Sequence, residues 1–204
     1  MFFKERNMKM SQEIEIEYKN LLTKEQYEML LIEFKIDQQQ VKRQTNHYFD
    51  TPQWHLRKLS SGLRIRETAS KIVCTLKEKT SEHTHLETTD RITAEEAALM
   101  LNGKEFHAPS VKSKLQQLQV PIQELKVFGT LTTDRVEIPY ENGLLVLDHS
   151  FYLNSDDYEV EYETNDEIIG STIFNKFLLK YNIEQRKTDK KIARFMNALQ
   201  SQKG

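Results

Sequence analysis

Residues 13–19 read EIEIEYK, and charged and apolar side chains alternate strictly along this stretch. A period of two is typical of a β-strand with one buried face. The charged face carries Glu13, Glu15, Glu17 and Lys19, and the apolar face carries Ile14, Ile16 and Tyr18. Acidic side chains at successive positions of one face repel one another, so contact with solvent alone gives no reason to collect them there.

Other strand-like segments carry charges that are also sorted by sign. The basic positions are Arg64, Arg66, Lys77 and Lys79, and the acidic positions of the last strand are Asp157, Glu159, Glu161 and Glu163. If the sheet curls so that acidic and basic strands face each other, these side chains line one cavity. Such a cavity suits a triphosphate with a divalent cation, because Arg and Lys bind phosphate oxygens and carboxylates bind hard cations. Solvent-exposed strand faces with cross-strand ion pairs would show the same spacing. The spacing alone therefore does not decide between a ligand-binding cavity and exposed strand faces.

The rest of the chain predicts an α+β fold with about eight strands and four or five helices. The strands are expected at residues 12–19, 43–50, 62–68, 71–79, 83–92, 127–138, 143–153 and 158–164. Their short connections favour antiparallel pairing. Thr23 with Gln26, and Thr93 with Glu96, have the spacing of helix-capping boxes. A sheet of this size must bury one face or close on itself, and the amphipathic helices are expected to cover its apolar side.

The composition favours one cytoplasmic domain. The chain has 204 residues, a net charge of −2 and a single cysteine, Cys74. Balanced charge argues against a nucleic-acid-binding protein, and one cysteine excludes an internal disulfide. No stretch approaches the roughly 20 apolar residues that span a bilayer, and the opening MFFKERNMKM lacks the apolar run of a signal peptide. We expect residues 1–10 to be a disordered leader and residues 11–204 to form the domain.

A series of motifs resembles, in the same order, the CYTH family, which is named for class IV adenylate cyclases and thiamine triphosphatase. They are Glu15-x-Glu17-x-Lys19, NHYFDT from Asn46 to Thr51, GLRIRE with Arg64 and Arg66, TLKEK with Lys77, LETTDR with Glu87 and Arg91, GTLTTDR with Arg135, and LDHSFYLNSDDYEVEYE with Asp148, Glu159 and Glu161. The resemblance spans nearly the whole chain and is to the small, single-domain bacterial members. It implies a CYTH-like domain, a triphosphate tunnel metalloenzyme whose eight antiparallel strands close into a barrel with acidic and basic side chains inside and amphipathic helices outside.

The resemblance also implies roles for individual residues. Candidate ligands for Mg²⁺ or Mn²⁺ are Glu15, Glu17, Asp148, Glu159 and Glu161. Candidate phosphate-binding residues are Lys19, Arg64, Arg66, Lys77, Lys79 and Arg135, with Lys19 and Glu87 as catalytic candidates. Family members often end in a Ser-Lys element that closes the tunnel. The tail here reads RKTDKKIAR, so Lys190 or Lys191 could take that place, and Lys191 is favoured.

The function predicted from these residues is a metal-dependent triphosphatase. Its substrate would be inorganic tripolyphosphate, thiamine triphosphate or a nucleoside triphosphate, and the protein would be a monomer or a homodimer. One alternative is a cyclase that converts ATP to cyclic AMP, which needs an adenine-holding site that the sequence does not reveal. Another is a module that binds a triphosphate or polyphosphate without turnover.

Several residues with chemical potential receive a structural interpretation. Cys74 has the parity of apolar positions and is expected to be buried. His83 and His85 could bind a transition metal as a His-x-His pair, but without further ligands a position in a loop is favoured. Trp54 is expected to pack beside a turn, and Phe195 and Met196 lie on an apolar helical stripe that predicts core.

Overall fold

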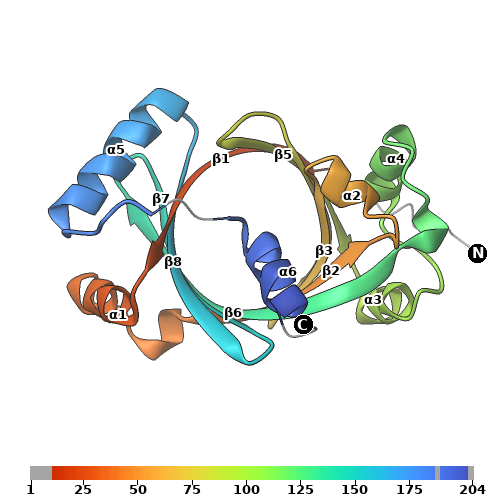
Figure 1. Ribbon diagram of the computed structural model, residues 1–204, viewed down its shortest axis with the longest axis horizontal. Helices are drawn as coiled ribbons and strands as arrows, with labels where there is room; N and C mark the ends of the chain where they lie inside the picture. Colours follow the sequence, from red (N-terminus) through yellow and green to blue (C-terminus); the bar gives the residue numbers. More distant parts are fainter. Residues whose placement is uncertain (1–10, 187–188, 202–204) are drawn as a thin grey trace, which may run out of the picture.

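Eight strands form a closed, entirely antiparallel barrel, as predicted (Figure 1). The computed structural model describes residues 11–186 and 189–201. The order around the barrel is β1-β5-β4-β3-β2-β6-β7-β8. The strands are β1 (Ser11–Leu22), β2 (Lys42–Asp50), β3 (Gly62–Thr68), β4 (Ile72–Lys79), β5 (Thr84–Ile92), β6 (Lys126–Tyr140), β7 (Gly143–Tyr152) and β8 (Ser155–Thr164). The expected leader, residues 1–10, lies outside the described residues.

The first strand closes the barrel because it is long enough to pair with two neighbours in succession. Its first half, up to Ile16, pairs with β5, and its second half, from Ile16 onward, pairs with β8. The register places Glu15 opposite His85 on β5 and Lys19 opposite Glu161 on β8. Residues that face each other across neighbouring strands point to the same side of the sheet, so these four side chains point to one side.

The helices lie in two groups on opposite flanks of the barrel, with one exception (Figure 1). They are α1 (Lys24–Glu33), α2 (His55–Lys58), α3 (Ala94–Leu101), α4 (Pro109–Gln117), α5 (Glu167–Lys180) and α6 (Lys191–Ser201), with 3₁₀ turns η1 (Gln38–Gln40) and η2 (Ile122–Glu124). Both predicted capping boxes are present, at Thr23 and at Thr93. No helix among the described residues is both long and apolar enough to cross a membrane.

The hydrophobic core lies outside the barrel, because the interior is charged. One cluster joins the outer side of β3, β4 and β5 to α2, α3 and α4, and includes Leu63, Ile65 and Leu115. A second cluster joins β1, β6, β7 and β8 to α1 and α5, and includes Tyr162 and Phe177. Cys74 belongs to the first cluster and is fully buried, which confirms that prediction. The apolar parity of each strand therefore positions the opposite, charged parity inside.

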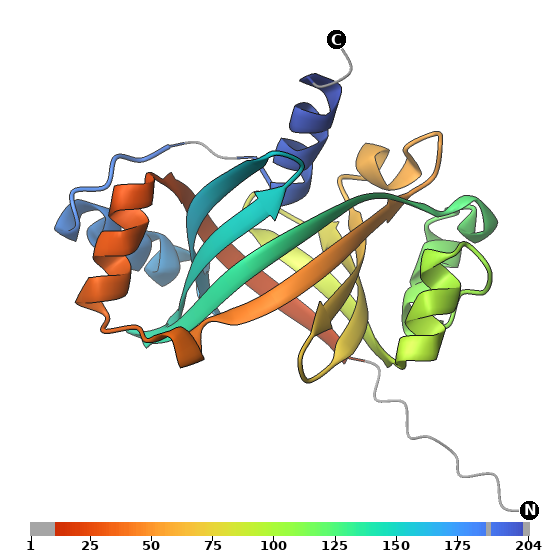
Figure 2. The ribbon, with the colours of Figure 1, turned by 90° about the horizontal axis from the view of Figure 1, so that it is seen from below.

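Helix α6 is the exception, because it begins at one opening of the barrel and projects outward from it (Figures 1 and 2). Phe195 packs against Phe128 and Tyr152, with ring centroids 6.3 and 6.2 Å apart. A side chain on Gly129 would overlap the ring of Phe195, so this close approach requires glycine there. Phe195 and Met196 are buried as predicted, but they cover the mouth of the barrel and belong to neither outer cluster.

Candidate active site

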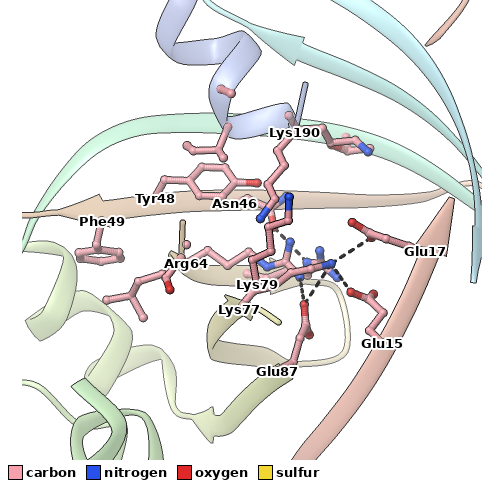
Figure 3. Close-up of a pocket in the computed structure, with 18 of the residues that line it drawn as sticks. Glu15, Glu17, Asn46, Tyr48, Phe49, Arg64, Lys77, Lys79, Glu87 and Lys190 are labelled. Carbon is pink, nitrogen blue, oxygen red and sulfur yellow. Dashed lines mark hydrogen bonds and ion pairs between the residues drawn. The ribbon is translucent and has the colours of Figure 1, made fainter. Parts of the chain in front are cut away.

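The barrel encloses a cavity of about 660 Å³ that the alternating charged residues line (Figure 3). Its lining includes Glu15, Glu17, Lys19, Arg64, Arg66, Lys77, Lys79, Glu87, Arg135, Glu161 and Lys191. The two remaining predicted site residues, Asp148 and Glu159, are fully buried in the wall beside Glu161. The structure thus brings all the predicted residues together around one space, whose size suits a small ligand.

Glu15 and Glu17 form the first acidic group, and a lysine ammonium sits between them. Lys77 contacts Glu15 and lies 3.0 Å from Oε2 of Glu17, while Lys19 donates a 2.8 Å hydrogen bond to Oε1 of Glu17. Burial alone would raise the pKa of Glu17, but Lys19 and Lys77 hold it well below its usual range. Glu17 is therefore ionised and already accommodates positive charge.

Asp148, Glu159 and Glu161 form the second acidic group, and Lys191 inserts into it from the start of α6. Its Nζ lies 2.9 Å from Asp148 and 2.7 Å from Glu161, and it also contacts Glu159. Arg135 adds a two-pronged contact to Asp148, at 2.8 and 2.6 Å. Burial would lower the pKa of Lys191, but the three carboxylates raise it well above its usual range. Lys191 therefore carries a full positive charge, and three carboxylates surround it.

Both acidic groups have the donor chemistry of a divalent-cation site. Ligand atoms of Asp148, Glu159 and Glu161 lie within 4.8 Å of one another, and all are carboxylate oxygens. Hard cations such as Mg²⁺ and Mn²⁺ prefer such donors. The lysines in these groups show that each accommodates a positive charge. A bound ion would have to displace an ammonium or share the carboxylates with it.

The opposite wall of the cavity carries cationic side chains with fewer partners. Arg64 lies 3.5 Å from Glu87, whereas Arg66 forms no ion pair with a carboxylate in the described parts of the chain. The one hydrogen bond of its Nε goes to Asn46 Oδ1, at 3.0 Å. Burial, followed by the neighbouring charges of Arg64 and Arg135, lowers the pKa of Arg66 to about 9. Positive potential therefore accumulates here, as an anion-binding wall requires.

The two tail lysines differ in their surroundings. Lys190 points into the cavity from the residue before α6 (Figure 3). Burial and the charge of Lys77 lower its pKa to about 8, and its Nζ donates a long hydrogen bond of 3.4 Å to the carbonyl of Ser60. Lys191 is instead surrounded by carboxylates. The geometry makes Lys190 the better placed of the two to meet a phosphate, although the sequence favoured Lys191.

Sequence reasoning missed several residues that shape the site. Asp50, in the NHYFDT motif, accepts hydrogen bonds from the backbone N–H groups of Thr51, Leu56 and Arg57 and so fixes the turn into α2. Arg194 of α6 binds Asp157 and Glu159. A charged residue one turn after Lys191 was the only signal available for it.

The sequence interpretation favoured a position in a loop for His85, and this was wrong. It is part of β5 and is 2% exposed, and its Nδ1 lies 3.8 Å from Oε1 of Glu17. The ligand atoms of Glu15, Glu17 and His85 lie within 4.8 Å of one another. Burial, followed by the nearby charge of Lys77, lowers the pKa of His85 to about 3, so the imidazole is neutral. The signal was available in the parity of His85 with Glu87.

One part of the cavity lining is apolar. Tyr48, Trp54, Phe128 and Met196 all contribute to it, and the rings of Trp54 and Phe128 meet edge to face with centroids 5.3 Å apart. Trp54 thus packs beside the turn, as predicted. This surface could not be predicted from the sequence, because its members come from β2, β6, α6 and the turn before α2.

A comparison with known protein families shows which family the chain belongs to. The profile of the CYTH domain matches residues 13–196, a range that begins within β1 and ends within α6. The chain belongs to the CYTH family. The CYTH fold agrees with the closed barrel and its charged interior.

Individual CYTH relatives align along almost the whole chain. YjbK of Bacillus subtilis, described as a candidate triphosphatase, is 41% identical over 186 residues, which are 91% of this chain and 96% of YjbK. A crystal structure from Bacillus halodurans, described as a candidate adenylate cyclase, has a TM-score of 0.87 and 42% identity, covering 91% of this chain and 99% of that one. The Hippeastrum protein HpAC1, whose structure is described as revealing a dominant triphosphatase activity, has a TM-score of 0.74 and 22% identity, covering 91% and 95% of the chains. At that identity, HpAC1 supports the fold alone.

Glu163 gives a prediction for the pH dependence of stability. Burial raises its pKa from 4.5 to about 7, against the opposing effect of Arg135 at 3.8 Å. The folded state then holds this proton more tightly than the unfolded state, so stability falls as the pH rises from 4.5 to 7. We expect Glu163→Gln to be more stable than the wild type by roughly 1 kcal/mol near pH 8, after allowance for solvent screening. The two should be equally stable near pH 4, where both side chains are neutral. Urea unfolding at both pH values measures this, and an equal difference at both would contradict the assignment.

Proposed function

We propose that the protein is a divalent-metal-dependent triphosphatase that hydrolyses inorganic tripolyphosphate or a small organic triphosphate inside the barrel. The observation that carries this proposal is that one cavity is bordered both by two groups of carboxylates and by the guanidinium groups of Arg64 and Arg66, which have few anionic partners. A triphosphate with its metal needs both surfaces at once, and phosphoryl transfer needs little covalent chemistry from the protein. The family membership and the description of YjbK support the same conclusion.

In this proposal Mg²⁺ or Mn²⁺ is held by Glu15, Glu17, Asp148, Glu159 and Glu161. The ion supplies Lewis acidity toward the phosphate oxygens. Arg64, Arg66, Lys79 and Lys190 would bind the oxygens of the substrate, and Lys77, Arg135 and Lys191 would join them where a metal ion takes their place among the carboxylates. Charge-assisted contacts of this kind, made in an enclosed site, stabilise the charge that shifts between oxygens during the reaction.

Lys19 and Glu87 would act closest to the reacting bond. Lys19 lies between the two acidic groups, 2.8 Å from Glu17 and 3.9 Å from Glu161, so it can follow a phosphate oxygen that enters between them. Glu87 lies 3.5 Å from Arg64 and 3.7 Å from Lys77, on the anion-binding side. A carboxylate in that position can orient Arg64 or accept a hydrogen bond from the attacking water.

The test is phosphate release from tripolyphosphate, ATP and thiamine triphosphate, with Mg²⁺, with Mn²⁺ and with a chelator. We expect release that requires the metal. Arg43→Ala is a suitable control variant, because Arg43 pairs with Asp134 on the exposed outer face. Absence of phosphate release from all three substrates with either ion would refute the proposal.

A cyclase is the second candidate, because the cavity has an apolar surface at Tyr48, Trp54, Phe128 and Met196 that could hold a base. The description of the Bacillus halodurans relative points the same way. Cyclisation of ATP releases pyrophosphate and forms cyclic AMP, whereas hydrolysis releases orthophosphate. Measuring both products from ATP separates the two reactions. Tight binding of tripolyphosphate without either product would instead indicate a binding module.

A further inference from the structure

His85 is the only histidine that the structure places in a group of potential metal ligands within the described residues. The barrel register sets it directly opposite Glu15 on one side and Lys79 on the other. Its side chain therefore points to the same face as the carboxylate of Glu15 and the ammonium of Lys77, which is the interior face. His83, two residues earlier, instead packs its ring against that of Tyr18, with the ring centroids 4.5 Å apart and the planes tilted by 32°.

The imidazole of His85 is buried with both nitrogens unused. It is 2% exposed, and neither Nδ1 nor Nε2 has a hydrogen-bond partner among residues 11–186 and 189–201. Buried polar atoms are almost always satisfied, because desolvating them without a partner costs free energy. A buried ring with two unsatisfied nitrogens beside two carboxylates can therefore take a ligand without breaking any hydrogen bond.

The atoms around His85 match one class of ligand. A neutral imidazole nitrogen can donate a lone pair to a metal ion, and the carboxylate oxygens of Glu15 and Glu17 lie within 4.8 Å of it. Imidazole suits Zn²⁺ and other borderline first-row ions, and Mn²⁺, although it also takes carboxylate oxygens, accepts an imidazole nitrogen more readily than Mg²⁺ does. The ammonium of Lys77 now lies against the same two carboxylates, so this point already holds a positive charge.

We propose that Glu15, Glu17 and His85 form a mixed oxygen–nitrogen site that selects a first-row transition-metal ion over Mg²⁺. The second acidic group of Asp148, Glu159 and Glu161 offers oxygen only. The two groups would then differ in the ions they prefer, and occupation of the first would free Lys77 to meet a phosphate. This inference deepens the metal requirement of the proposed function, but it is tested by metal binding without substrate.

The experiment uses the full-length protein and two ions, Mn²⁺ and Mg²⁺. Calorimetric titration gives the affinity for each, and pulsed electron paramagnetic resonance of bound Mn²⁺ detects a coordinated nitrogen. We expect wild-type protein with isotopically labelled histidine to show a label-dependent coupling to Mn²⁺. His85→Gln should lose this coupling and bind Mn²⁺ at least about tenfold more weakly, with less than about a threefold change for Mg²⁺.

His83→Gln is the matched control, because it makes the same replacement two residues away, where the histidine ring packs against Tyr18. It should keep both the coupling and the wild-type Mn²⁺ affinity. No histidine coupling in the labelled wild type would overturn the proposal, as would equal weakening of both ions in His85→Gln. If His85→Gln does not fold, the absence of any coupling in the labelled wild type would still overturn the proposal. An inactive protein that shows the coupling would refute the triphosphatase and leave this site standing, and an active protein without it would do the reverse.

Discussion

Arg66→Ala is expected to lower kcat/KM for a triphosphate by at least about 100-fold, which corresponds to about 3 kcal/mol of lost binding to the transition state. Arg66 is half-buried, faces the cavity and has only Asn46 as a hydrogen-bond acceptor for its Nε. A phosphate group would supply the negative charge that the described surroundings of this guanidinium lack. The loss should therefore fall on substrate binding, and titration of tripolyphosphate in the presence of a chelator measures it without turnover.

The same substitution should leave the fold intact. Burial and the neighbouring charges of Arg64 and Arg135 already lower the pKa of Arg66 to about 9, so its charge costs free energy in the folded state. Removing the charge relieves that cost, and we expect a thermal midpoint equal to or above that of the wild type. Function and stability would then change in opposite directions, as they commonly do at binding sites.

Arg135→Ala provides the contrast, because Arg135 binds Asp148 and Glu161. Removing it leaves the fully buried carboxylate of Asp148 with Lys191 as its remaining cation. Breaking a buried ion pair on one side typically costs about 3–5 kcal/mol, so this variant should lose both stability and activity. If Arg66→Ala unfolded as readily as Arg135→Ala, or retained the wild-type KM, the anion-binding assignment of Arg66 would be wrong.

The strand pattern allowed most of the barrel to be predicted from the sequence. Because side chains alternate across a strand, the parity of Glu15 and Glu17 assigns them to one face, and the apolar parity of Ile65 and Leu63 assigns the other to the core. The number of strands and the concentration of charged residues on one parity agree with a charged interior, and the resemblance to the CYTH family implied that the sheet closes into a barrel. Local information was sufficient here because each strand carries its own pattern.

Neighbours across strands could not be predicted in the same way. His85 gains its meaning from its register with Glu15, and that register depends on how β1 divides its pairing between β5 and β8. The position of Lys191 depends on where α6 begins at the mouth of the barrel. The packing of Phe195 against Gly129 holds α6 there. These are non-local contacts, and no single segment of the chain carries a signal for them.

Glu161→Gln is expected to weaken the binding of the activating metal ion by about two orders of magnitude or more. The reason is that it removes one of the three charges of the group formed by Asp148, Glu159 and Glu161. Glutamine keeps the size of the side chain but has one weakly donating oxygen and no charge. The metal concentration for half-maximal activity should rise accordingly, and kcat at saturating substrate should fall. Tripolyphosphate binding in a chelator should be unchanged or tighter, since the cavity becomes more positive.

The stability of this variant separates a ligand role from a structural one. Burial would raise the pKa of Glu161, but Lys191 and Arg135 hold it well below its usual range, so the wild-type carboxylate is ionised in the folded protein. Glu161 accepts from Lys191 at 2.7 Å and from Arg135 at 2.8 Å, while both cations keep Asp148 as a partner in the variant. We therefore expect a loss of about 1–3 kcal/mol in the free energy of unfolding, small enough for the variant to fold. Glu28→Gln, on the exposed face of α1, controls for the loss of one surface charge. If Glu161→Gln kept the wild-type metal requirement while losing stability, Glu161 would serve to hold Arg135 and Lys191 and not a metal ion.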